Sequence, residues 1–181
     1  MRVIGGEAKG RRLKMVRGTT TRPISDRVKE ALFSILGERV EEARFLDLFA
    51  GTGSVGIEAL SRGAAWAVFV EQQRQAIFTI KDNLEQTGLK DRAQVVRSDV
   101  FAFLGKEGLE PFDVVYVAPP QYRQLWAKTV QVLDGSVLLG SESVVVAQIH
   151  PKEYADLKLE ALELVDRRKY GSTMLCFYLA A

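Results

Sequence analysis

Cysteine and histidine are scarce in this chain, whose 181 residues include one Cys and one His. One residue of each type is too few for a His/Cys zinc site, so we expect no metal. Cys176 lies in the apolar run 174–179, which predicts a buried position in a strand. His150 precedes Pro151 at the end of a predicted strand, which favours a structural or surface role over that of a general base.

Long apolar runs are also lacking. None reaches the length of a membrane span, and nothing resembles a signal peptide. We therefore expect a cytoplasmic protein without membrane contact. The length fits one domain, residues 1–181, and a hydrophobic content of 47% is enough for an ordinary core. A small domain of this kind leads us to expect a monomer.

Charge is distributed unevenly along the chain, although the net charge is only +2. Residues 1–22 contain seven basic residues and one acid, which gives this segment a net charge of +6 and leaves −4 for residues 23–181. A basic arm on a mildly acidic core is typical of proteins that bind a polyanion, although a solvated surface without a partner is an alternative. The candidate contacts to a polyanion are Arg2, Lys9, Arg11, Arg12 and Lys14 in the arm, with Arg167 and Arg168 near Tyr170.

Continuous apolar or β-branched runs recur along the chain and predict strands that are buried on both faces of a parallel sheet. Helices are predicted between them, with right-handed crossovers. The last two runs flank Tyr170-Gly171-Ser172, which predicts a hairpin and an antiparallel final strand. The sequence therefore indicates an α/β fold with a seven-stranded, mostly parallel sheet. The predicted strands are 45–49, 67–70, 94–97, 114–117, 144–149, 162–169 and 173–179, and the predicted helices are 55–62, 74–87, 100–106 and 123–133.

The N-terminal part lacks this alternation. Glycines punctuate short apolar stretches in residues 1–20, which indicates a hairpin or an extended arm. A helix follows, because apolar residues from Val28 to Leu36 recur at helical spacing. Ser25 or Asp26 is the expected cap, and Gly37 the expected end.

The most informative motif runs from Phe45 to Gly56, where an apolar run breaks into glycines and then becomes helical. Its glycines fit the spacing GxGxxG, and Glu71 follows Gly51 by twenty positions at the end of the next apolar run. A carboxylate in that place can accept a hydrogen bond from a ribose hydroxyl. The spacing alone predicts a nicotinamide dinucleotide.

Asp47 argues against a dinucleotide, because it lies on the strand that enters the glycine turn and would repel a pyrophosphate. S-adenosylmethionine has no phosphate, and its sulfonium and ammonium groups are cationic. We therefore predict S-adenosylmethionine as the cofactor. The alternative is a turn that binds no ligand, because a single GxGxxG match is weak evidence for a binding site.

A second acid, Asp99, follows the third strand run and should lie at the carboxyl edge of the sheet. There it can accept a hydrogen bond from an adenine amino group. The structural alternative is that Ser98 or Asp99 only caps the helix that begins at Val100. The two roles are compatible.

The fourth strand run ends in Ala118-Pro119-Pro120-Gln121-Tyr122, and here the chain resembles a known family. It resembles the bacterial guanine-N2 methyltransferases of small-subunit ribosomal RNA, the RsmD type, over nearly its whole length. The other motifs that carry the resemblance are Met1 to Gly6 with Lys9-Gly10, Thr21-Arg22-Pro23, Asp26 to Phe33, Asp47 to Gly53, Glu71, Asp99 and Lys169-Tyr170-Gly171.

The resemblance implies a Rossmann-like fold for S-adenosylmethionine-dependent methyl transfer, with ribosomal RNA or the small ribosomal subunit as partner. It implies that the basic arm holds RNA. It also implies a set of residues around the donor, which are Thr21, Arg22, Pro23, Asp47, Phe49, Ala50, Gly51, Thr52, Gly53, Glu71, Asp99 and Val100.

The Pro-Pro loop departs from the family pattern, which has Asp or Asn before the prolines and an aromatic residue directly after them. Here Ala118 precedes them and Gln121 delays Tyr122 by one position. An exocyclic amine conjugated to a purine is a poor nucleophile, so hydrogen-bond acceptors must orient its lone pair and an aromatic ring must hold the base. Gln121 could replace the missing acceptor. The candidate catalytic residues are Ala118, Pro119, Pro120, Gln121 and Tyr122.

Three functions are consistent with the sequence. The first is in-line transfer of a methyl group from S-adenosylmethionine to guanine N2 in RNA, without metal or covalent intermediate. The second keeps the donor but targets an adenine amine or a protein amide. The third is a protein that binds donor and RNA but no longer catalyses, because its loop is altered.

Overall fold

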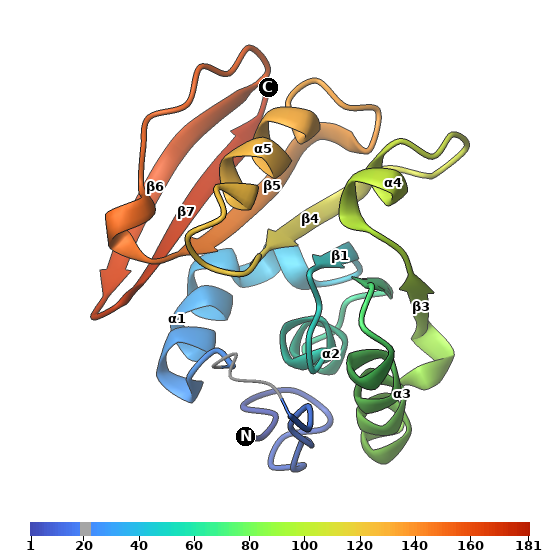
Figure 1. Ribbon diagram of the computed structural model, residues 1–181. Coiled ribbons are helices and arrows are strands. Elements are labelled where there is room, and N and C mark those ends of the chain that lie inside the picture. Colours follow the sequence, from blue (N-terminus) through green and yellow to red (C-terminus); the bar gives the residue numbers. More distant parts are fainter. Residues whose placement is uncertain (19–22) are drawn as a thin grey trace.

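The computed structural model describes residues 1–18 and 23–181, and its centre is a seven-stranded sheet of order β3-β2-β1-β4-β5-β7-β6 (Figure 1). Strands β1 to β5 run parallel, whereas β7 is antiparallel to both of its neighbours. The fold predicted from the sequence is confirmed. The strands are β1 Arg44–Leu48, β2 Trp66–Glu71, β3 Ala93–Arg97, β4 Phe112–Val117, β5 Leu139–Ile149, β6 Leu162–Tyr170 and β7 Thr173–Ala180.

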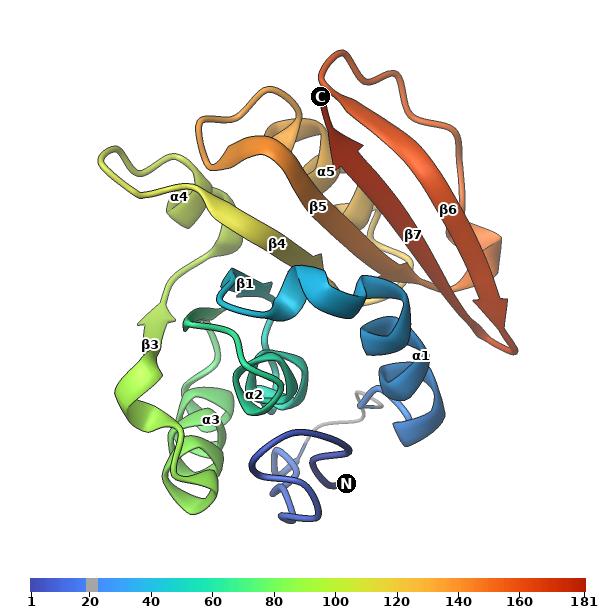
Figure 2. The ribbon, with the colours of Figure 1, turned by 180° about the vertical axis from the view of Figure 1, so that it is seen from behind.

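Helices cover both faces of the sheet. The helices are α1 Asp26–Leu36, α2 Ser54–Ser61, α3 Arg74–Thr87, α4 Val100–Leu104 and α5 Leu125–Leu133, with 3-10 turns η1 Gly37–Val40, η2 Lys90–Arg92 and η3 Pro151–Glu153. One apolar core joins α1, α2, α3 and the N-terminal segment to one face. A second core joins α4 and α5 to the other face (Figure 2). Cys176 is fully buried in β7, as predicted.

The predicted helices and strands are all present, and their ends differ by a few residues. The main difference is β5, which begins at Leu139 instead of residue 144. Its first part is polar and pairs irregularly with β4, and Ser143 there donates a hydrogen bond of 2.7 Å from its hydroxyl to the Phe112 carbonyl. The apolar run 144–149 does not reveal this extension, because Leu139 is followed by glycine and three polar residues.

Helix α1 begins and ends where the sequence predicts. The Ser25 hydroxyl accepts a hydrogen bond of 3.2 Å from the Val28 N–H, so Ser25 is the cap. Gly37 follows the helix with a φ of +55°, a conformation that favours glycine. The buried face includes Leu32 and Leu36 and, unexpectedly, Lys29.

The basic N-terminal segment is docked on the core instead of projecting from it. Arg2 and Arg12 form an antiparallel bridge, which agrees with the predicted hairpin. A side chain of α2 holds the backbone of this segment by hydrogen bonds. The Glu58 carboxylate accepts bonds of 2.9 Å from the N–H groups of both Ile4 and Gly5. Figures 1 and 2 show the segment beside α2, on the side away from the sheet.

A buried charge cluster joins this segment to α1 and α2. Lys29 and Glu58 are both fully buried, with Nζ of Lys29 3.3 Å from Oε1 of Glu58. The Lys29 ammonium also donates to the Arg2 carbonyl at 2.7 Å and to the Ser54 hydroxyl at 3.0 Å. Burial lowers the pKa of Lys29, and the Glu58 carboxylate opposes this shift. Arg62 donates to the other Glu58 oxygen at 2.8 Å, so both oxygens of Glu58 and the ammonium of Lys29 have partners on several elements.

Replacing Glu58 with Ala should lower the free energy of unfolding by about 3 to 5 kcal/mol, because it leaves a buried ammonium and two backbone N–H groups without their acceptor. Urea unfolding measures this change. The control is Glu30→Ala, since Glu30 is an exposed partner of Arg62 and its loss should cost less than about 1 kcal/mol. Equal stability of the two variants would refute a structural role for the cluster.

Candidate functional site

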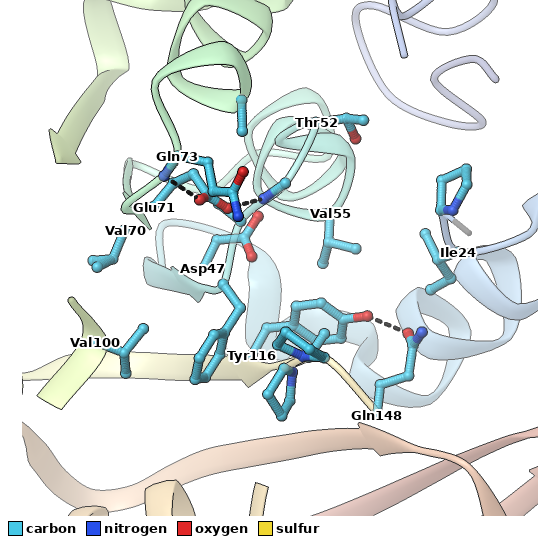
Figure 3. Close-up of a pocket in the computed structure, with 18 of the residues that line it drawn as sticks. Ile24, Asp47, Thr52, Val55, Val70, Glu71, Gln73, Val100, Tyr116 and Gln148 are labelled. Carbon is cyan, nitrogen blue, oxygen red and sulfur yellow. Dashed lines mark hydrogen bonds between the residues drawn. The ribbon is translucent and has the colours of Figure 1, made fainter. Parts of the chain in front are cut away.

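A cavity of about 650 Å³ opens at the carboxyl ends of the parallel strands (Figure 3). The order of the strands reverses between β1 and β4, and the cavity lies at that point. Open α/β sheets bind ligands at such switch points. A cavity of this volume is in the usual range for small-molecule sites. Asp47 of β1, Glu71 of β2 and Tyr116 of β4 contribute to its lining.

The turn after β1 reverses the chain sharply into α2. Phe49, Gly51 and Gly53 all have positive φ, of 59°, 59° and 79°. Glycine adopts this conformation without steric cost, whereas Phe49 is strained there. The turn is held by the Ala50 N–H, which donates to the Val70 carbonyl at 3.0 Å. Of the residues predicted to contact the donor, Phe49, Ala50, Gly51 and Thr52 line the cavity, whereas Gly53 does not.

The third glycine of the motif, Gly56, allows close packing of α2 on the sheet. A Cβ at this position would lie 2.3 Å from the Phe69 ring and 3.1 Å from Oδ2 of Asp47. The Gly56 N–H donates to that same oxygen at 3.0 Å. Any larger residue would push α2 away from β1 and β2.

Asp47 is 1% exposed, and it is among the residues that line the cavity. Burial raises the pKa of its carboxyl well above the usual range; the Gly56 N–H opposes this shift, and the charge of Glu71 adds to it. A buried acid of this kind is stabilised by a cationic ligand group and repels an anionic one. The electrostatics of the site therefore favour a cationic ligand over a pyrophosphate.

Glu71 is oriented at the end of β2 by two backbone groups. Its Oε1 accepts from the Gly51 N–H at 3.1 Å, and its Oε2 accepts from the Gln73 N–H at 2.7 Å (Figure 3). Each carboxylate oxygen has a further lone pair, so the oriented group can also accept hydrogen bonds from ligand hydroxyls. This arrangement fits a ribose, as the spacing from Gly51 predicts.

Asp99 and Val100 line the same cavity, at the start of α4. Oδ2 of Asp99 accepts from the Ala102 N–H at 3.0 Å, so the capping role is present. The side chain is exposed, and its other oxygen is available to a ligand. Its role toward an adenine amino group stays a prediction.

The Pro-Pro loop forms one wall of the cavity. Ala118, Pro119, Pro120 and Gln121 line it, whereas Tyr122 does not. The chain turns at Tyr122, which has a φ of +62° and is 63% exposed.

Tyr122 is held on the outer side of this loop. Its N–H donates to Oε1 of Glu153 at 2.7 Å. Its ring lies against His150, with the centroids 5.6 Å apart. His150 in turn caps η3, because its Nδ1 accepts from the Lys152 N–H at 3.1 Å. His150 therefore has a structural role, as expected, but it is next to the loop from which it is distant in sequence.

The remaining predicted residues are distributed as follows. Pro23 lines the cavity, and Thr21 and Arg22 lie outside the described residues. The predicted RNA contacts are on the surface and not in the cavity. Three of them take part in exposed ion pairs, which are Arg2 with Asp26, Lys14 with Asp82 and Arg168 with Asp166.

Sequence reasoning missed several cavity residues, of which Tyr116 and Gln148 are the most notable. The Tyr116 hydroxyl donates a hydrogen bond to Oε1 of Gln148 (Figure 3). Burial raises the pKa of Tyr116 well above its usual range, and Asp47 adds to this. The available signal was Gln148 itself, a polar residue near the end of the apolar run 144–149. The other missed residues that line the cavity include Met15, Val16, Ile24, Gln73 and Thr173.

Within residues 1–18 and 23–181, no helix is long and apolar enough to cross a membrane. The same two ranges contain no group of three or more His, Cys, Asp and Glu side chains arranged to hold a metal ion.

Comparison with known proteins gives consistent matches. The chain is 40% identical to the putative rRNA methyltransferase YlbH of Bacillus subtilis, with 98% of each chain covered. It is 37% identical to ribosomal RNA small subunit methyltransferase D of Escherichia coli, over 82% of this chain and 74% of that protein. The solved structure of the putative methyltransferase yhhF from Escherichia coli superposes with a TM-score of 0.88 at 32% identity, covering 99% of this chain and 97% of that one.

A family model also matches almost the whole sequence. The model described as conserved hypothetical protein 95 matches residues 1–179. It therefore includes the glycine turn, the Pro-Pro loop and the C-terminal hairpin. The chain belongs to this family, the RsmD family of methyltransferases.

Proposed function

We propose that this protein transfers a methyl group from S-adenosylmethionine to the N2 amine of a guanine in small-subunit ribosomal RNA. The observation that carries the proposal is one cavity bounded by an acidic end, with Asp47 and Glu71, and by the Pro-Pro loop. The names of the relatives support ribosomal RNA as the substrate class. Such a substrate places the reaction in the cytoplasm.

The residues at the acidic end fit this cofactor. Glu71 is oriented to accept from the ribose hydroxyls, and Asp99 is available to the adenine amine. Asp47 is positioned to attract the positive charge at the methionine end. When bound, S-adenosylmethionine supplies a methyl group on a sulfonium, which is an electrophile that needs no further activation.

The Pro-Pro loop orients the nucleophile. The backbone carbonyls around Ala118 and Pro119 accept hydrogens of the target amine, and the two prolines restrict the directions of these carbonyls. As the new N–C bond forms, the S–C bond breaks, its electron pair stays on sulfur, and the amine loses one proton to water. Gln121 lines the cavity beside these carbonyls and is the side chain placed to supply the acceptor that Ala118 lacks.

Basic side chains of the N-terminal segment and of β6 are the proposed contacts to the RNA backbone. These contacts are Arg2, Lys9, Arg11, Arg12, Lys14, Arg167 and Arg168, and all lie outside the cavity. In the proposed complex they hold phosphates while one guanine enters the cavity. A monomer is sufficient for this arrangement.

The decisive experiment incubates the protein with labelled S-adenosylmethionine and small ribosomal subunits that lack methylation, and then digests the RNA. We expect the label in N2-methylguanosine. Label in another nucleoside would refute guanine N2 as the target. Donor binding without any label would favour the catalytically silent protein, whose supporting observation is Ala118 in the loop.

Replacing Asp47 with Asn should weaken donor binding by at least about tenfold, because the cationic end of the donor loses its carboxylate. The same change should stabilise the protein. The pKa of the Asp47 carboxyl is higher in the native state than in the unfolded chain. As pH rises above about 4, the unfolded chain therefore loses this proton first, and the native state becomes less stable relative to it. Calorimetric titration measures the affinity, and urea unfolding measures the stability.

The stability gain of Asp47→Asn should therefore grow from pH 4 toward pH 7. The matched control is Asp82→Asn, an exposed carboxylate on α3. It should change neither donor affinity nor the pH profile. Unchanged donor affinity in Asp47→Asn would contradict the proposed role of this acid.

Replacing Gln121 with Ala should lower turnover by up to about a hundredfold, by analogy with the loss of one oriented hydrogen-bond group in other enzymes. Donor affinity should stay unchanged. Single-turnover methylation separates the chemical step from binding. Gln75→Ala, an exposed glutamine on α3, is the control. Full turnover in Gln121→Ala would show that the loop carbonyls are sufficient.

A further inference from the structure

Four polar side chains form a row across one face of the sheet. Asp47 of β1 is paired in register with Phe69 of β2 and with Tyr116 of β4, and Tyr116 is paired with Val146 of β5. Side chains two positions apart on a strand share a face. Glu71 therefore lies on the same face as Asp47 and Tyr116, and so does Gln148.

The row runs along the cavity from one end to the other. Strand order places Glu71 and Gln148 three strands apart, and since neighbouring strands are about 4.8 Å apart, the two side chains begin about 14 Å from each other. Figure 3 shows Glu71 and Gln73 at one end, Gln148 and Ile24 at the other, and Asp47 between them. A donor held by Glu71 and Asp47 leaves the Gln148 end for another molecule.

The Gln148 amide is held in a defined orientation. Its Oε1 accepts from the Tyr116 hydroxyl, so its two N–H donors are directed elsewhere. Within residues 1–18 and 23–181, no protein acceptor takes either donor. Gln148 is half-buried and lines the cavity on the strand next to the one that leads into the Pro-Pro loop.

We propose that Gln148 binds the target base by donating an amide N–H to a ring nitrogen of that base, and that Tyr116 is the positioning residue for this amide. The inference rests on the proposed methyl transfer and deepens it. Beside its N2 amine, guanine presents N3 as an acceptor and N1–H as a donor. Of these two groups only N3 can accept a hydrogen bond from the Gln148 N–H donors. The base therefore enters with its N3 side toward β5 while the amine faces the Pro-Pro loop.

Three variants test this assignment with methylated RNA as the readout. Gln148→Ala should lower kcat/KM for RNA by about tenfold, as expected for one lost hydrogen bond. Gln148→Glu should lower it further, because a carboxylate has no N–H donor and repels N3. Tyr116→Phe should have a smaller effect than either, since the amide is kept but its orientation is lost. All three should bind S-adenosylmethionine with wild-type affinity.

Gln94→Ala, an exposed glutamine on β3, is the control and should behave as wild type. Wild-type kcat/KM in Gln148→Ala would overturn the proposal. Weakened donor binding in Gln148→Ala would also overturn it, because that result would place Gln148 in the donor site. A melting temperature below that of the control, with kcat/KM unchanged, would show a purely structural role.

A second measurement does not depend on catalysis. The side-chain amide resonance of Gln148, identified by its loss in Gln148→Ala, should shift when guanosine 5′-monophosphate is added to the protein saturated with S-adenosylhomocysteine. Absence of a shift at millimolar nucleotide would overturn the proposal. Label in a nucleoside other than N2-methylguanosine would instead refute guanine N2 as the target, and the Gln148 variants would then be compared on that acceptor.

Discussion

The contact between Gly56 and Asp47 is the constraint on which the cavity depends. The Gly56 N–H reaches the Asp47 carboxyl at 3.0 Å only because no Cβ separates α2 from the sheet. This packing holds an acid in a nearly dry position, and the preceding turn then brings the Gly51 N–H to Glu71. One close approach between a helix and two strands thus orients the two carboxylates at the acidic end of the cavity, Asp47 and Glu71.

A second buried cluster connects the N-terminal segment to the same helix, α2. Ser54 begins α2 directly after the glycine turn, and its hydroxyl accepts from the fully buried Lys29. Glu58, one turn later, holds the backbone of Ile4 and Gly5. The basic segment proposed to contact RNA is therefore connected through one helix to the turn that forms the donor end of the cavity.

The sequence predicts the fold and one end of the cavity well, because these follow from local patterns. Apolar runs locate the strands, and the Gly51 to Glu71 spacing locates a carboxylate at the end of β2. It does not predict contacts between distant segments. The neighbours Tyr122 and His150, and the pair Tyr116 and Gln148, come together only through the order and register of the strands.

The backbone of the Pro-Pro loop and of the residues after it is held in a strained conformation, which fits the proposed catalytic role although Ala118 lacks a polar side chain. Tyr122 and Gln124 both have positive φ, and such strain costs on the order of 1 to 3 kcal/mol per residue. The Glu153 carboxylate helps to offset this cost by accepting from the Tyr122 N–H. Since the methyl donor is intrinsically reactive, most of the protein's contribution is positioning, which an anchored loop backbone provides.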